Sequence, residues 1–407
     1  PLGSAAQPYV EGGNTRHRFA QLNLGSDNRY FLAPGAEWYS VNAGGERERH
    51  ALGSRTESRF IIGGTHFWGH TDFYLAAPIF SFGEAAFTTG AESVFQFFPW
   101  RIEHRKLRPY FGFSWLTSHY QQGEGAKLTR FRLPLLTGLV YNRGPHLFEL
   151  GLGYNYNNQL QYYTSRTSVS HIRTQPYWLS FCYKWMFETT LHSEKNWKGG
   201  RTRILTDSLT AANRLSGLTL SFGPSEAIFL KTSPHNEAVA PYLDQHVATK
   251  VFPDVGIGYY FSRPDIQLHA AYRGYRNRIS AYGYTQTAKR QALSLEVFRF
   301  WFDYHGFALF AGPALSYEWL QVQDSDAPAG GGGAAGRFSG IKPGLSFGWD
   351  IRPDRLQTFY LRTTLRYFPN LNVPMTGGEP FRFDTLELNF IQMVLFPGRM
   401  FKRRLSR

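Results

Sequence analysis

The sequence lacks the features that identify several common classes of protein. Of its 407 residues only Cys182 is a cysteine, which excludes a disulfide framework and a zinc site built on cysteines. No apolar run approaches the roughly 18 residues of a membrane-spanning helix, and the mean hydropathy is −0.36. The chain also has no P-loop, no Rossmann glycines and no calcium-loop spacing of carboxylates. Its composition therefore indicates neither a helical membrane protein nor a nucleotide- or metal-dependent enzyme, and no cofactor is expected.

Aromatic residues and glycine are abundant instead. Aromatics make up 17% of the chain and there are 41 glycines, a pairing typical of β-barrels with aromatic girdles and closely packed strands. The formal charge is +14, but the basic residues are dispersed and no finger, helix-turn-helix or RNP-like motif accompanies them. The charge is therefore attributed to anionic lipid headgroups or a cation-lined lumen, and no nucleic-acid partner is expected.

The clearest single segment is the last one, residues 383–396. From Leu386 onward its even-numbered positions are apolar, with Gln392 as the only break, and its odd-numbered positions are mixed. A strand with lipid on one side and a polar lumen on the other gives this pattern. The even positions predicted to face lipid are Leu386, Leu388, Phe390, Val394 and Phe396.

Similar segments recur along the whole chain. Counting them predicts an all-β fold, a transmembrane antiparallel up-and-down β-barrel of about sixteen strands, with about fourteen as the next choice. A soluble β-sandwich is the alternative fold. The predicted strands are 16–24 (extending towards 31), 58–65, 72–79, 92–98, 107–119, 128–141, 146–162, 175–189, 214–222, 251–261, 266–275, 286–302, 307–322, 338–350, 356–368 and 383–396.

The connections between these segments sort by length, as they do in bacterial barrels with short periplasmic turns and long extracellular loops. The expected outer loops are 223–250, 276–285, 323–337 and 369–382, and the stretch 34–56 is also read as a loop. Connection 192–213 is long but falls on the periplasmic side, and 204–212 within it is predicted to be helical. The predicted domains are an N-terminal segment 1–15, a single barrel 16–396 and a basic periplasmic tail 397–407. A signal peptide is expected to have been removed, or residues 1–4 to be a protease-site remnant.

Charged residues at inward positions are the candidate functional set. Directly opposed residues on neighbouring strands approach to roughly 5 Å, so such charges form ladders of opposite sign. They either cross-link and solvate the lumen wall or act as an electrostatic filter for anionic solutes. The candidates are Arg108, Arg130, Arg132, Glu149, Glu296, Glu318, Lys342, Arg362, Arg366 and Glu387.

Two other constellations contain reactive residue types. His66 and His70, with Asp72, have ligands that a metal could use, but their spacing suits a helix and the stretch is predicted to be strand–turn–strand. Ser118-His119 and His192-Ser193-Glu194 contain the residues of a lipase-type site. Sequence neighbours on a strand point to opposite faces, so neither pair forms a nucleophile and base alone. No metal site and no catalytic residues are expected.

Three blocks of sequence resemble a known group of proteins. RHRFAQLNL at 16–24, FGWDIRP at 347–353 and LRYFPNLNV at 365–373 resemble uncharacterised outer-membrane barrel proteins of Bacteroidota. The resemblance implies a bacterial outer-membrane location and a barrel fold, and brings no activity or catalytic residue with it. Such bacteria use barrel subunits as accessories in large outer-membrane machines, which adds other outer-membrane proteins or lipoproteins to the expected partners beside outer-membrane lipids.

Three functions follow as hypotheses. The first is a porin-like channel for small polar, including anionic, solutes, with 223–250 as a constriction loop. The second is a non-catalytic barrel subunit of an outer-membrane assembly or secretion complex. The third is a lipid-modifying barrel enzyme, which would need a Ser/His pair from non-adjacent strands.

Overall fold

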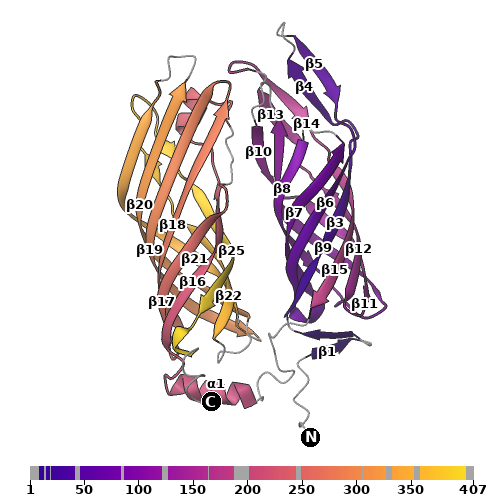
Figure 1. Ribbon diagram of the computed structural model, residues 1–407, viewed down its shortest axis with the longest axis vertical. Helices are drawn as coiled ribbons and strands as arrows, with labels where there is room; N and C mark the ends of the chain where they lie inside the picture. The colour runs from indigo at the N-terminus through magenta and orange to yellow at the C-terminus, as the bar shows by residue number, and fades with distance from the viewer. Residues whose placement is uncertain are drawn as a thin grey trace. The chain divides into compact units, whose positions relative to one another are not determined.

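The computed structural model describes residues 9–12, 15–18, 20–41, 46–83, 87–121, 127–163, 165–187, 201–243, 249–304, 307–326, 332–352 and 358–399. The chain consists of two compact units, Pro1–Lys195 and Asn196–Arg407. Each unit contains one closed antiparallel barrel of eight strands, drawn in indigo to magenta for the first and in pink to yellow for the second (Figure 1). None of the described helices is both long enough and apolar enough to cross a bilayer.

The first barrel closes because β8 and β9 pair with each other as well as with their other neighbours, and β15 pairs with β3. Its wall strands are β3 (Ala20–Leu32), β6 (Arg55–His66), β7 (Thr71–Gly83), β8 (Phe87–Phe97), β9 (Leu107–Gln121), β11 (Leu135–Arg143), β12 (His146–Tyr154) and β15 (Tyr177–Phe187). Its other elements are β1 (Tyr9–Gly12), β2 (Thr15–Arg18), β4 (Glu37–Val41), β5 (Arg47–Ala51), the 3₁₀ turn η1 (Phe67–Gly69), β10 (Lys127–Arg132), β13 (Gln159–Tyr163) and β14 (Val169–Arg173).

The second barrel closes where its first strand pairs with its last. Its wall strands are β16 (Gly217–Phe229), β17 (Phe252–Phe261), β18 (Ile266–Ala281), β19 (Tyr284–Tyr304), β20 (Phe307–Asp326), β21 (Ala335–Ile351), β22 (Phe359–Tyr367) and β25 (Thr385–Leu395). Its other elements are α1 (Arg201–Ala211), α2 (Pro234–Val239), β23 (Asn372–Val373) and β24 (Phe381–Arg382).

The prediction of one barrel over residues 16–396 with about sixteen or fourteen strands is corrected by these two rings. In a single large barrel, segment 175–189 would pair with 214–222. Instead β15 pairs with β12 and β3, and β16 pairs with β17 and β25. Alternation along a strand sets which face is apolar, but it holds no information about which strand closes the ring.

The distribution of side chains between the two faces follows the alternation. In β9, Leu107 and Phe111 are each 58% exposed, whereas Tyr110 and Ser114 are buried. The same holds for β12 and β15, where Leu150 and Phe181 are exposed, whereas Leu147 and Trp178 occupy inward positions and are buried. The prediction of apolar exteriors is therefore confirmed, and the interior of each eight-stranded barrel is narrow enough to be filled by side chains.

The last strand departs from strict alternation. Leu386 and Phe390 are partly exposed, but Val394 and Phe396 are buried, at 0% and 2%. The pairing of β25 shifts register against both neighbours, between Phe222 and Ser225 on β16 and between Arg362 and Thr364 on β22. A bulge of this kind exchanges the two faces of a strand. Assigning Val394 and Phe396 to the outside was wrong, and Gln392, the break in the pattern, points inward with them.

Several predicted loops are more ordered than expected. Stretch 34–56 contains the β4–β5 hairpin, and 223–250 contains the end of β16 and all of α2. Stretch 276–285 is the tip of the β18–β19 hairpin, whose connection is only Tyr282 and Gly283, both with positive φ, as a tight hairpin turn requires. Predicted helix 204–212 is confirmed as α1. Strands 128–141 and 146–162 are each divided in two. Residues 400–407 of the tail lie outside the described residues.

Candidate functional site

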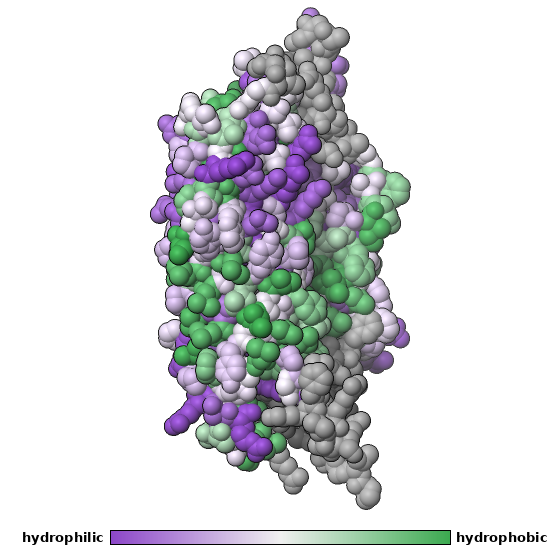
Figure 2. Space-filling view, turned by 60° about the vertical axis from the view of Figure 1, so that its left-hand side comes forward, coloured by the Kyte–Doolittle hydropathy of each residue, from purple (hydrophilic) through white to green (hydrophobic). Residues whose placement is uncertain are grey.

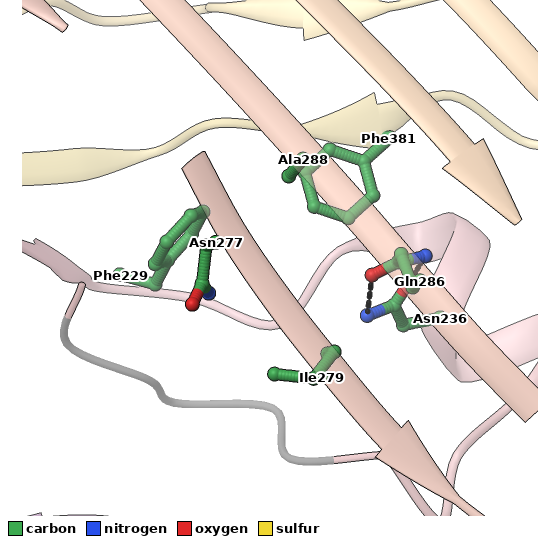
Figure 3. Close-up of a pocket in the computed structure, with 7 residues that line it drawn as sticks. All are labelled: Phe229, Asn236, Asn277, Ile279, Gln286, Ala288 and Phe381. Atoms are coloured by element: carbon green, nitrogen blue, oxygen red, sulfur yellow. Dashed lines mark hydrogen bonds between the residues drawn. The ribbon is translucent and has the colours of Figure 1, made fainter. Parts of the chain in front are cut away.

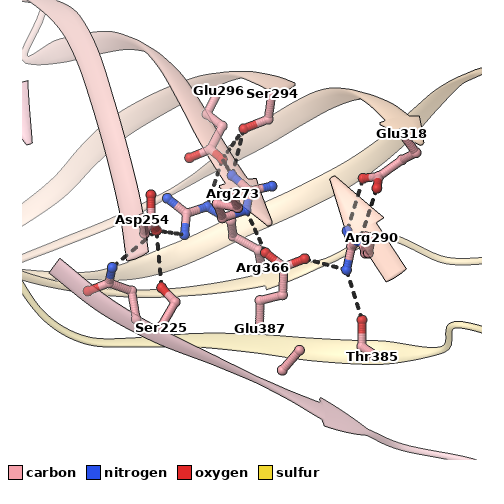
Figure 4. A network of polar contacts seen from close by, with 12 residues as sticks. Ser225, Asp254, Arg273, Arg290, Ser294, Glu296, Glu318, Arg366, Thr385 and Glu387 are labelled. Carbon is pink, nitrogen blue, oxygen red and sulfur yellow. Dashed lines mark hydrogen bonds and ion pairs between the residues drawn. The ribbon is translucent and has the colours of Figure 1, made fainter. Parts of the chain in front are cut away.

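The interior of the second barrel contains an alternating chain of acids and bases (Figure 4). Arg290 makes a bidentate ion pair with Glu318, with N–O distances of 2.8 and 2.9 Å. Its Nη1 pairs with Glu387, and the same carboxylate lies 2.6 Å from Arg273 Nε. Four strands, β18, β19, β20 and β25, supply these groups, and all four side chains are buried.

The chain continues through a second half of the network. Arg273 Nη1 lies 3.2 Å from Glu296, whose oxygen also accepts from Arg366 Nε at 2.7 Å. Arg366 Nη1 lies 2.6 Å from Asp254, and Asn389 donates to the same aspartate at 3.1 Å. The complete sequence of contacts is Glu318, Arg290, Glu387, Arg273, Glu296, Arg366 and Asp254.

Another part of this interior is packed with aromatic side chains around one guanidinium. Arg362 makes a bidentate pair with Asp350 at 2.7 and 2.9 Å and donates to Gln267 at 2.7 Å. Its guanidinium lies 4.7 Å from the ring centre of Phe298 and 5.0 Å from that of Phe310. A cation held over aromatic faces in this way is attracted by their quadrupoles, so the wall is tied together here as well.

The first barrel has a lysine at the centre of its main network. Lys184 Nζ lies 2.6 Å from Asp72, 2.6 Å from Glu149 and 3.1 Å from Gln96 Oε1. It also lies 4.1 Å from the ring centre of Tyr74. These contacts bring β7, β8, β12 and β15 together through one buried ammonium group.

A second cluster in the first barrel is built on three arginines. Arg29 pairs with Asp27 at 2.6 Å and with Glu92 at 2.7 Å. Arg55 and Arg59 both pair with Glu57, at 2.6 and 2.5 Å. These side chains are all buried. Both interiors are therefore lined with paired charges of both signs, which resembles a cross-linked wall more than a ring of one charge.

The structure places the sequence candidates in three kinds of position. Six of them are buried in the charge groups described above: Glu149 with Lys184, Arg362 with Asp350, and Glu296, Glu318, Arg366 and Glu387 in the alternating chain. Arg132 is buried and donates to the Asn157 carbonyl at 2.9 Å, and Arg130 is half-buried. Lys342 is half-buried and donates to the Asn370 carbonyl rather than pairing with Glu318. The expected grouping of Arg108, Arg130 and Arg132 around Glu149 does not form.

Arg108 pairs with a turn residue instead. Its Nη2 lies 2.9 Å from Glu103, which also accepts from Lys106 at 2.5 Å. The hydrogen bond from Lys106 and the charge of Arg108 lower the pKa of the Glu103 carboxyl, although partial burial opposes them. Sequence reasoning missed this group because Glu103 lies in the connection between two strands rather than on a wall.

We expect Glu103→Gln to lower the free energy of unfolding by less than about 1 kcal/mol, because exposed ion pairs contribute little. A depressed folded-state pKa stabilises the protein above the unfolded pKa of roughly 4.3, and this stabilisation is lost as the pH falls through the folded value. Urea unfolding of both proteins in detergent at pH 7 and pH 3 measures the effect. A difference that persists unchanged at pH 3 contradicts it.

Several buried charges that tie the networks together were not among the candidates. They share one signal, a charged residue at an inward position of a strand whose outward positions are apolar. Lys184, for example, alternates with the outward Tyr183 and Trp185. The missed residues are Asp27, Arg29, Arg55, Glu57, Arg59, Asp72, Glu92, Lys184, Asp254, Arg273, Arg290 and Asp350.

The end of the second barrel nearest α2 has a small pocket (Figure 3). Asn236 of α2 and Gln286 of β19 donate to each other at 3.1 and 2.8 Å, and His235 lies 2.6 Å from the buried Asp324. The helix is thus attached to the inner wall by side-chain hydrogen bonds. The pocket is lined by Phe229, Asn236, Asn277, Ile279, Gln286, Ala288 and Phe381.

The structure shows the contacts or the burial of most of the potentially metal-binding or catalytic residues noted in the sequence. His70 Nδ1 lies 3.0 Å from the Phe98 carbonyl, and Asp72 belongs to the Lys184 network. Ser118 is buried, its neighbour His119 is half-buried, and His192-Ser193-Glu194 lies outside the described residues. Within the described part of the chain, no group of three or more His, Cys, Asp or Glu side chains is placed to hold a metal ion.

Comparison with known proteins gives distant likenesses. No protein-family model and no curated protein matches the sequence. Neisserial surface protein A is 14% identical, with a TM-score of 0.31, covering 44% of this chain and 98% of that one. Ail, the attachment invasion locus protein of Yersinia pestis, is 9% identical, with a TM-score of 0.27 and coverage of 44% and 97%. An outer membrane channel from Pseudomonas putida F1 is 9% identical, with a TM-score of 0.20 and coverage of 97% and 98%. The fold assignment follows from the strand pairing alone.

Proposed function

We propose that both barrels span a bacterial outer membrane and serve as closed, non-catalytic anchors in an outer-membrane assembly or secretion complex. The observation that carries this proposal is the filling of both interiors by paired charges, such as Lys184 with Asp72 and Arg290 with Glu318. Outward leucines and aromatics supply the surface that lipid requires. Examples are Leu150 at 61%, Phe181 at 51% and Leu295 at 55% exposure.

The connections support an orientation. In the second barrel, the β16–β17 connection, which contains α2, and the β22–β25 connection, which contains β23 and β24, are long, and the turns at 262–265 and 305–306 at the other end are short. The two-residue β18–β19 turn is the short connection at the α2 end. Long connections belong on the extracellular side and short turns on the periplasmic side. The end with α2 then faces outward, and the end with α1 faces the periplasm.

A small sheet built from long connections offers a surface for a partner. Strands β13, β14, β4 and β5 pair in that order, at the end of the first barrel that also bears its long connections (Figure 1). The sheet leaves β13 and β5 as edge strands, and exposed edges can accept a strand from another chain. This favours a role in assembly, with other outer-membrane proteins or lipoproteins as partners.

We expect the protein to give no conductance steps when reconstituted in planar bilayers, because buried ion-pair networks occupy both lumens. The measurement is a current trace at applied potentials up to about 100 mV, where the field acts on charge at about 2.3 kcal/mol per elementary charge. Pull-down in mild detergent should bring a partner in stoichiometric amount. Steady ohmic steps would instead support the porin-like channel for small polar or anionic solutes, which is the alternative function.

The remaining expectations from the sequence stay predictions. They are the absence of enzymatic activity and of a cofactor, removal of a signal peptide, and kinship with outer-membrane barrels of Bacteroidota. Lipid profiles that change on deletion of the gene would support the lipid-modifying enzyme.

A further inference from the structure

A row of cations crosses the outer surface of the second barrel. Arg276 on β18 is directly opposite Lys289 on β19, Lys289 is opposite Gln321 on β20, and Gln321 is opposite Arg337 on β21. Arg278 lies two residues beyond Arg276 on the same face. The four basic side chains are exposed. They therefore form a cationic row near the β18–β19 hairpin turn, with cations on β18, β19 and β21 and the neutral Gln321 on β20.

Like charges in this register repel each other. Directly opposed outward residues have Cβ atoms about 4.5–5.5 Å apart, and like charges there are destabilising. Within the described residues, no carboxylate ion pair is made by the four cations. The acidic residues on these strands near the row, Glu318 and Asp324, point into the barrel instead. Among the ion pairs of the described residues, the row therefore has no carboxylate partner.

An apolar band lies immediately beside the row. The band consists of the outward residues four positions along each strand from the row. They are 39–63% exposed, and they pair across the four strands in the order Tyr272, Leu293, Tyr317 and Ile341. Trp319 lies between the band and the row. Figure 2 shows hydrophilic surface above a hydrophobic band on this side of the molecule. Aromatics at such a border mark the level of lipid headgroups.

We infer that the cationic row, defined by Arg276, Arg278, Lys289 and Arg337, binds the phosphate groups of an anionic glycolipid in the outer leaflet. The inference rests on the proposed orientation, which places this end of the barrel at the outer surface. Acyl chains of the lipid pack on Tyr272, Leu293 and Ile341, and its phosphates accept hydrogen bonds from the guanidinium and ammonium groups above them. Bridging Arg276 and Lys289 with one phosphate relieves their repulsion.

The test is a binding titration on the full chain purified in neutral detergent, with native mass spectrometry counting bound diphosphoryl lipid A. Each cation near an anionic lipid contributes about fivefold in affinity, so Arg276→Gln with Lys289→Gln should weaken binding about 30-fold. Arg276→Lys with Lys289→Arg keeps both charges and should stay within about threefold of the wild type. Arg299→Gln removes an exposed charge from the other end of β19 and should stay within about twofold, because it lies outside the row.

Three results would overturn the inference. One is equal affinity of the wild type and the double glutamine variant. Another is binding of dephosphorylated lipid A as tight as that of the diphosphoryl form. The third is displacement of the lipid by about 10 mM inorganic phosphate, which would identify a site for the free ion. Failure of the wild type to enter the membrane fraction of cells would reject the proposed function itself. Cell fractionation measures this independently of the lipid titration, so the two failures can be distinguished.

Discussion

Replacing Lys184 with methionine should lower the free energy of unfolding of the first barrel by about 3–5 kcal/mol, because removing one partner leaves buried charges uncompensated. Lys184 is the cation that both Asp72 and Glu149 contact at 2.6 Å. Without it those carboxylates keep only the amide donors Asn23 and Gln96, each at 3.0 Å. Urea unfolding in detergent micelles, followed by tryptophan fluorescence, measures the change.

A matched variant separates lost charge from lost packing. Adding Asp72→Asn and Glu149→Gln to Lys184→Met removes the whole ionic group, and replacing a complete buried network by neutral side chains is often close to neutral. The triple variant should therefore recover most of the loss. If the triple variant is less stable than Lys184→Met alone, the buried carboxylates are not the source of the destabilisation.

The second large effect is expected in the other barrel. Glu387→Gln keeps the shape of the side chain but removes the charge that joins Arg273 and Arg290. The two guanidinium groups then lose the anion between them, and the free energy of unfolding is expected to fall by about 3–5 kcal/mol. Heat-induced mobility shifts on gels and urea titration both report this loss.

The control for this change is Glu379→Gln, which removes an exposed carboxylate on the connection between β22 and β25. It should alter stability by less than about 0.5 kcal/mol. Equal effects of Glu387→Gln and Glu379→Gln would show that the alternating chain does not stabilise the barrel. Because each ring of the described strands closes on itself, the Lys184 and Glu387 variants should each shift a different unfolding transition.

Much of each wall could be predicted from the sequence, because a strand between lipid and a filled interior must alternate. The outward Leu107 and Phe111 and the inward Tyr110 follow from period two alone. The strand pair that closes each ring could not be predicted, since the apolar face of β15 would point outward whether β15 paired with β3 or with β16. The only trace of the β25 bulge in the sequence is Gln392 among apolar residues. It could not be recognised as a bulge without the shifted pairing of β25 with β16 and β22.

Some of the inward-facing charged residues could be predicted by the same reasoning. Glu296, Glu318 and Glu387 were identified by position, but the ion pairs that they form were not, because these pairs join residues across the barrel interior as well as on adjacent strands. Arg366 and Asp254, for example, belong to β22 and β17, which share no pairing. Contacts across an interior depend on its diameter, and a narrow ring of eight strands brings together residues that a wide one would leave in water.

Closure of each ring by strands of its own half has a consequence for biosynthesis. β3 meets β15 and β16 meets β25, so a break in the polypeptide between Lys195 and Asn196 would sever no described ladder. Two shorter genes, each with its own export signal, would then encode cylinders that fold independently.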